Sequence, residues 1–140
     1  MDITPIVARL SIIAKNVQLL KEHRSTSHDE FINDQILQDA VEREFQVTIQ
    51  AALDIGSMIL SDQSVSVPET YGDIFPKLSE IGVIPVELAE KLAGMAKFRN
   101  ILVHMYVEVD IDKVYQYLQH NLGDMEAFAR YIGEYVGKEL

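Results

Sequence analysis

The chain has 140 residues, 48% of them hydrophobic, which fits one domain over residues 1–140 with a sizeable apolar core. It has no cysteine, so disulfides, thiolate nucleophiles and cysteine-based zinc sites are excluded. Its formal net charge of −10 opposes non-specific binding to phosphate backbones, which depends on lysine and arginine. A general nucleic-acid binder is therefore disfavoured, whereas a nuclease that holds RNA in a local cleft stays compatible with the composition.

Neither export nor membrane insertion is predicted. The N-terminal segment has no basic region and carries charges at Arg9 and Lys15, unlike a signal peptide. The longest apolar stretch, Ile49 to Leu60, is interrupted by Asp54 and is shorter than the roughly 18 residues that a membrane span needs. We expect a soluble cytoplasmic protein that has no membrane partner.

The first half of the chain predicts two long helices. Thr4 as N-cap, with Pro5 after it, starts a helix that runs to about His23. Ser27 and Glu30 match a capping box, and the apolar stripe that begins there continues to Leu60 as one helix.

The second half predicts a short helix and two longer ones. After a loop over 61–69, a short helix spans 71–81, with a kink expected at Pro76 and an end at Gly82. Pro85 begins a fourth helix, and Asp110 or Asp112 begins a fifth that continues through Val136. No convincing strand is seen. The sequence thus predicts an all-α fold, an antiparallel bundle of four to five helices.

One arginine lies at an unusual place in the fourth helix. Arg99 falls within roughly 20° of Leu88, inside the apolar stripe, where a solvated arginine is not expected. Asn100 and His104 are four residues apart and share a face. Three small residues precede them on that side: Ala89, Ala93 and Ala96. This arrangement favours a cleft or a symmetric dimer contact.

A purely structural reading of the same residues stays open from spacing alone. An arginine near a helix C-terminus can donate to the last carbonyls, and the helix dipole favours a histidine there. Tyr106 by itself reads as a helix-end aromatic packed on the bundle.

The segment from Arg99 to Tyr106, however, resembles the R-X4-H-X-Y motif of HEPN toxins of the HepT type. Four stretches that cover most of the chain read like that family's pattern: Phe45 to Ile55, Tyr71 to Phe75, Leu78 to Ile84 and Phe98 to Tyr106. The resemblance implies a HEPN-like helical bundle and a homodimer whose protomers both contribute Arg99 and His104 to one cleft.

The implied activity is that of a metal-independent endoribonuclease toxin without cofactors. The ribose 2′-hydroxyl would attack the phosphate, leaving a cyclic phosphate and a 5′-hydroxyl. His104 suits the proton transfer near neutral pH. Arg99 suits charge-assisted hydrogen bonds to a phosphate oxygen, and Asn100 can orient either group. The substrate is therefore expected to be RNA.

The resemblance also implies a partner. In HepT-type systems a minimal nucleotidyltransferase (MNT) antitoxin adds AMP to the motif tyrosine, which here is Tyr106. Added phosphates beside the cleft would repel RNA. Two other readings stay open: a non-catalytic binding subunit of such a nucleotidyltransferase, and a structural dimerisation bundle in which Arg99 and His104 form a buried polar latch.

The remaining polar residues give weaker signals. No metal-ligand spacing is present, so metal binding is not expected, and three histidines are expected to be solvated: His23, His28 and His120. The charged run Glu42 to Glu44 is predicted to lie on the solvent-exposed face of the second helix. Asp54 either faces solvent or pairs with Arg99 across the bundle. Lys91 and Lys97 are the local candidates for RNA contacts.

Overall fold

The computed structural model describes residues 1–103 and 109–139. Within these residues the chain forms seven α-helices and one 3₁₀ turn and has no strand: α1 Thr4–His23, α2 His28–Ile32, α3 Gln35–Asp62, η1 Tyr71–Asp73, α4 Ile74–Glu80, α5 Val86–Val103, α6 Ile111–His120 and α7 Leu122–Glu139. The predicted all-α class is confirmed, although the helices outnumber the four to five expected.

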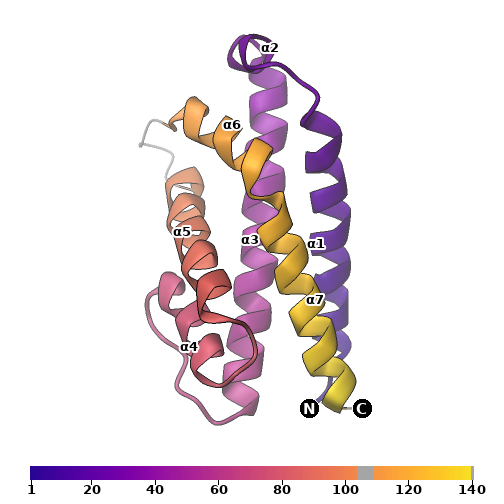
Figure 1. Cartoon of the computed structure of the whole chain (residues 1–140), viewed down its shortest axis with the longest axis vertical. Helices are drawn as coiled ribbons and strands as arrows, with labels where there is room; N and C mark the ends of the chain where they lie inside the picture. The colour runs from indigo at the N-terminus through magenta and orange to yellow at the C-terminus, as the bar shows by residue number, and fades with distance from the viewer. Residues whose placement is uncertain (104–108, 140) are drawn as a thin grey trace.

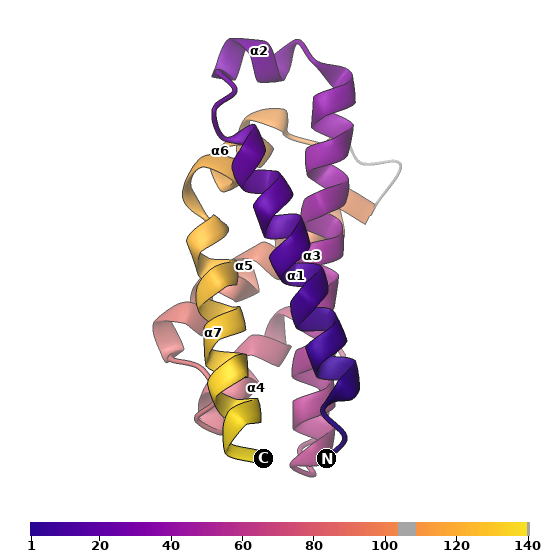
Figure 2. The ribbon, with the colours of Figure 1, turned by 90° about the vertical axis from the view of Figure 1, so that its right-hand side faces the viewer.

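Four long helices make up the bundle. α1, α3, α5 and α7 alternate in direction, so that each runs antiparallel to its neighbours (Figure 1). α3 packs against both α1 and α5, while α7 closes the bundle against α1 and α5. Both termini lie at one end, and α2 lies at the other (Figure 2). Among the helices described, none is long and apolar enough to cross a membrane.

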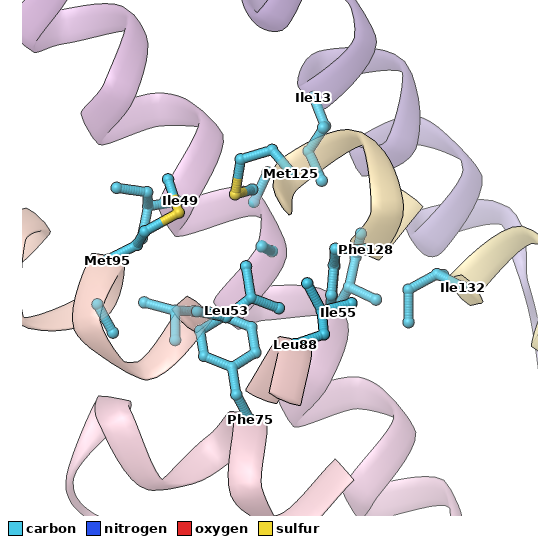
Figure 3. Packing of buried hydrophobic residues seen from close by; sticks show 14 of the residues in the cluster. Ile13, Ile49, Leu53, Ile55, Phe75, Leu88, Met95, Met125, Phe128 and Ile132 are labelled. Carbon is cyan, nitrogen blue, oxygen red and sulfur yellow. The ribbon is translucent and has the colours of Figure 1, made fainter. Parts of the chain in front are cut away.

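The core joins all of the long helices. Its side chains interdigitate between α3, α4, α5 and α7, with Phe75 meeting Phe128 edge to face at a centroid distance of 5.7 Å (Figure 3). Leu53 and Met95, each buried, fill the space beside them. Each such side chain contributes about 1.5–3 kcal/mol when it leaves water. Most of the apolar stripe residues predicted from the sequence are buried, whereas Ile32 and Ile36, beside the break between α2 and α3, are exposed.

The predicted long second helix is interrupted, so that expectation was wrong. Asn33 and Asp34 leave the helical conformation, and the Asp34 carboxylate accepts a hydrogen bond from the Leu37 amide at 3.0 Å, starting α3 as a new N-cap. The stripe hides the break because Phe31 before it and Val41 after it are both buried. The Ser27 hydroxyl accepts from the Glu30 amide at 3.2 Å, as the capping box predicted.

The predicted fifth helix is also two helices. Asn121 has φ −117° and ψ 3°, and its side-chain amide donates to Asp124 at 3.1 Å, within the first turn of α7. Leu118 and Leu122 are buried on either side of the bend. Since the apolar pattern does not change at Asn121, hydrophobic spacing alone does not reveal the break.

Two helix ends differ from expectation in detail. Thr4 is the first residue of α1 and not its N-cap; Asp2 accepts from the Thr4 amide at 3.0 Å. Pro76 lies in the first turn of α4, where the amides have no intrahelical partner, so a proline there needs no kink. Gly82, with φ +82°, follows α4 in a left-handed conformation, as its place after the helix predicted.

Candidate functional site

The last turns of α5 are fixed by an aromatic cluster. Phe98 is buried, stacks on Tyr117 of α6 with ring centroids 4.4 Å apart and planes 20° apart, and meets Phe45 of α3 edge to face at 5.7 Å. The Tyr117 hydroxyl donates to the Gly94 carbonyl at 3.4 Å, one turn earlier. Burial raises the pKa of Tyr117, which therefore stays a neutral donor. The cluster sets the rotation of α5 and so the direction of the next residue, Arg99.

Arg99 lies half-buried at the edge of the apolar stripe. Its Nη1 donates to Asn100 Oδ1 at 3.3 Å, and its guanidinium carbon is 5.3 Å from the centroid of the Tyr71 ring. Its Nε is buried and has no hydrogen-bond partner among the described residues. Both contacts orient the guanidinium without neutralising it, because an amide and an aromatic ring carry no charge. The side chain keeps its capacity to bind an anion.

A cavity of about 340 Å³ opens beside Arg99, between α1 and α3. One face of α3 forms much of its wall, with residues at helical spacing, and α1 forms the opposite side. Its lining consists of Ala8, Arg9, Ile12, Arg43, Gln46, Val47, Gln50, Ala51, Asp54 and Arg99. Three arginines and one aspartate give the cavity a positive lining in a chain whose net charge is −10.

The charges in the cavity differ in how far they are compensated. Arg9 Nε lies 3.3 Å from Asp54 Oδ2, and Gln50 Nε2 donates to the other carboxylate oxygen at 2.8 Å. Arg43 is exposed, and neither it nor Arg99 has a carboxylate within ion-pair distance in the part of the chain that the structure describes. Two arginines thus remain available for a negatively charged ligand.

Sequence reasoning missed the cavity. Arg43, Gln50 and Asp54 share one face of α3 by spacing, which the sequence could have shown, but their closeness to Arg9 and Arg99 depends on packing. Asp54 pairs with Arg9 rather than with Arg99. Ala89 and Ala96, which were expected beside a cleft or a dimer contact, are instead buried in the core of this chain.

Two histidines expected to be solvated have acidic partners. His23 Nε2 lies 3.3 Å from Glu44 Oε1, and His28 Nε2 lies 2.6 Å from Asp112 Oδ1. Glu44, which was predicted to lie on a solvent-exposed face, is only 8% exposed. Burial raises its pKa, and the neighbouring His23 opposes that rise. His120 is exposed, as predicted.

Other polar residues do not assemble into a site. Within residues 1–103 and 109–139, no three His, Asp or Glu side chains come together as metal ligands would. Lys97 is exposed, and Lys91 lies 3.9 Å from Asp124. Of the predicted site residues, the structure brings Arg99 and Asn100 together, whereas His104 and Tyr106 lie outside the described residues.

Comparisons with known proteins point to one family. The model of the family described as Ribonuclease HepT-like matches residues 13–132. An mRNA nuclease HepT from Shewanella oneidensis is 35% identical over 99 residues, which is 71% of this chain and 74% of that protein. A tRNA nuclease HepT from Aphanizomenon flos-aquae is 29% identical over 137 residues, 96% of this chain and 93% of that protein.

A solved structure gives the same result for the fold. The tri-AMPylated HEPN toxin of Shewanella oneidensis, in complex with an MNT antitoxin, superposes with a TM-score of 0.87 at 29% identity. The match covers 96% of this chain and 99% of that one. Helix order and packing are thus shared along almost the whole length, and the predicted resemblance is confirmed.

Proposed function

Because the chain belongs to the HepT-like ribonuclease family, we propose that it is the toxin of a toxin–antitoxin pair and cuts RNA without a metal ion. The observation that carries the proposal is Arg99, an uncompensated guanidinium oriented by Tyr71 and Asn100 at the wall of a positively lined cavity. The relatives support an RNA substrate, since one is named an mRNA nuclease and the other a tRNA nuclease.

In the proposed reaction a ribose 2′-oxygen bonds to the adjacent phosphorus while the bond from phosphorus to the 5′-oxygen breaks. One His104 takes the proton of the 2′-hydroxyl, and a second His104 gives a proton to the leaving 5′-oxygen. A homodimer supplies both histidines. Arg99 holds a non-bridging oxygen, whose negative charge grows during the attack, and Asn100 orients Arg99. The products are a 2′,3′-cyclic phosphate and a 5′-hydroxyl.

The proposed partner is an MNT-type nucleotidyltransferase that silences the toxin by adding AMP to Tyr106. The tri-AMPylated state of the Shewanella oneidensis toxin in its antitoxin complex supports this part of the proposal. We also propose a cytoplasmic location, where a chain without cysteine needs no oxidising environment.

The activity is tested by incubating total RNA in EDTA with purified wild type, Arg99→Ala and His104→Ala. Arg130→Ala and His120→Ala are matched controls: Arg130 also lies 5.3 Å from a tyrosine ring, that of Tyr131. We expect cleavage by wild type and both controls and its loss in both motif variants. Cleavage that persists in the motif variants contradicts the mechanism. Absence of cleavage in all five proteins favours a non-catalytic binding subunit instead.

The modification is tested separately by intact mass after co-expression with the nucleotidyltransferase. We expect added mass in multiples of AMP on wild type and on the control Tyr131→Phe, and none on Tyr106→Phe. An unmodified wild type, or an equally modified Tyr106→Phe, removes this part of the proposal while leaving the ribonuclease activity untouched.

A further inference from the structure

The cavity between α1 and α3 has two unsatisfied groups in its lining. Three side-chain atoms in the described part of the chain are buried without a hydrogen-bond partner, and two of them belong to cavity residues: Arg99 Nε, a donor, and Gln50 Oε1, an acceptor. Each buried donor or acceptor without a partner lowers the stability of the fold by about 1–3 kcal/mol. Both residues line the cavity, so a ligand bound there lies beside their side chains.

The unmet groups differ in the chemistry that they require. Arg99, together with the exposed Arg43, presents positive charge with no carboxylate partner in the described residues, which suits a phosphate. Gln50 Oε1 accepts a hydrogen bond and therefore suits a hydroxyl or an amino group. A nucleotide carries a phosphate and, on its base, an amino group that can donate to Gln50. The cavity volume, about 340 Å³, falls within the range of small-ligand pockets.

Side-chain contacts link several of the polar residues that line the cavity. Gln50 is tied to Asp54 by its amide, and Asp54 is tied to Arg9, whose Nη1 also donates to the Pro5 carbonyl at 3.1 Å. This chain of contacts joins α1 to α3 and holds the Gln50 oxygen in place. Arg9 therefore acts through its neighbours, whereas Arg43 and Arg99 face a ligand with their full charge.

We propose that this cavity binds one nucleotide of the RNA next to the scissile phosphate, with Arg43 on its phosphate and Gln50 on a base amine. The inference rests on the proposed ribonuclease function, because Arg99 belongs both to the cavity and to the motif. It assigns substrate binding to α1 and α3, which carry no residue of that motif. It also explains how a chain with net charge −10 holds RNA.

The test uses a fluorescent RNA oligonucleotide whose 2′-hydroxyls are methylated, so that it cannot be cut. Its affinity for the homodimer is measured by anisotropy at several salt concentrations for wild type, Arg43→Gln and the control Arg130→Gln, which removes one charge elsewhere. We expect Arg43→Gln to raise Kd about five- to tenfold and to lower the salt slope by about 0.7, the value for one phosphate contact on a single strand. Arg130→Gln is expected to change neither.

A second variant distinguishes recognition of a nucleotide from attraction to a negative charge alone. Gln50→Leu keeps the net charge, so we expect it to weaken RNA binding with the salt slope unchanged. Urea unfolding shows that the variant is folded, and Gln119→Leu on α6 is its control. Inorganic phosphate is titrated as a competitor in parallel. Displacement of RNA by phosphate at micromolar concentration would reveal a site for a free ion and overturn the proposal.

The remaining outcomes keep this inference apart from the proposed function. If wild type binds the methylated RNA through Arg43 but does not cut total RNA, the ribonuclease mechanism fails and the binding cavity stands. If wild type cuts RNA and Arg43→Gln binds as tightly as wild type, the cavity proposal fails. Sedimentation of Arg43→Gln is measured as well, because a shift to monomer with unchanged RNA affinity would make this face a protomer interface and overturn the proposal.

Discussion

The rings of Phe98 and Tyr117 stack with centroids 4.4 Å apart, and this contact fixes α5 one residue before Arg99. We expect Phe98→Ala to lower the free energy of unfolding by about 3–5 kcal/mol, because a buried ring is lost and a cavity remains. Tyr117→Phe keeps the stacking and loses only a 3.4 Å hydrogen bond, so a change of at most about 1 kcal/mol is expected. Urea unfolding measures both; equal losses would contradict the role given to the stacking.

Tyr71, which is 43% exposed, orients Arg99 through a cation–π contact between its ring and the guanidinium. Cation–π contacts at exposed sites contribute about 0.5–1 kcal/mol, which corresponds to about a two- to fivefold effect. We therefore expect Tyr71→Leu to lower kcat/KM for RNA cleavage by that factor and Tyr71→Phe to leave it unchanged. If Tyr71→Phe loses as much as Tyr71→Leu, the hydroxyl and not the ring is the important group.

Gly56 allows α4 to approach α3 closely. A Cβ at this position would lie 2.5 Å from Ile74 Cγ2 and 3.2 Å from Leu78 Cδ1. Gly56→Ala is expected to destabilise the protein by about 1–3 kcal/mol through overpacking. Gly133→Ala on α7, where a Cβ meets nothing within 4 Å, is expected to stabilise it by about 0.5–1 kcal/mol. Thermal unfolding of the two variants should give shifts of opposite sign.

Glu44 makes stability depend on pH. Burial raises its pKa above the ordinary 4.5, although His23 opposes the shift. The folded state then favours the protonated carboxyl, so its contribution is present below pH 4.5 and is lost as the pH rises through the raised value. Glu44→Gln cannot ionise, and its stability relative to wild type should rise as the pH increases above about 4.5. Glu90→Gln, at an exposed position, is the control; a difference that falls with pH would contradict the shift.

Most of the helical pattern could be predicted because burial follows periodicity. Leu92 and Met95 were expected in the core and are buried there. The breaks at Asp34 and Asn121 were missed because a polar residue between two helices does not interrupt the apolar stripe when both helices pack against the same core. Glu44 was wrongly predicted to face solvent because it lies in a run of charged residues. The sequence does not show that His23 of another helix packs beside it.

The sequence by itself determined the all-helical fold and singled out Arg99, since hydrophobic spacing is a local property and a charge within an apolar stripe is visible without coordinates. Only the tertiary structure decided what surrounds Arg99. Tyr71 orients it, Arg43 and Gln50 share its cavity, and Asp54 neutralises Arg9 instead. Tyr71, Gln50 and Arg43 lie tens of positions from Arg99 along the chain, as Asp54 does from Arg9. Their contacts depend on how α1, α3 and α5 pack, which no local pattern contains.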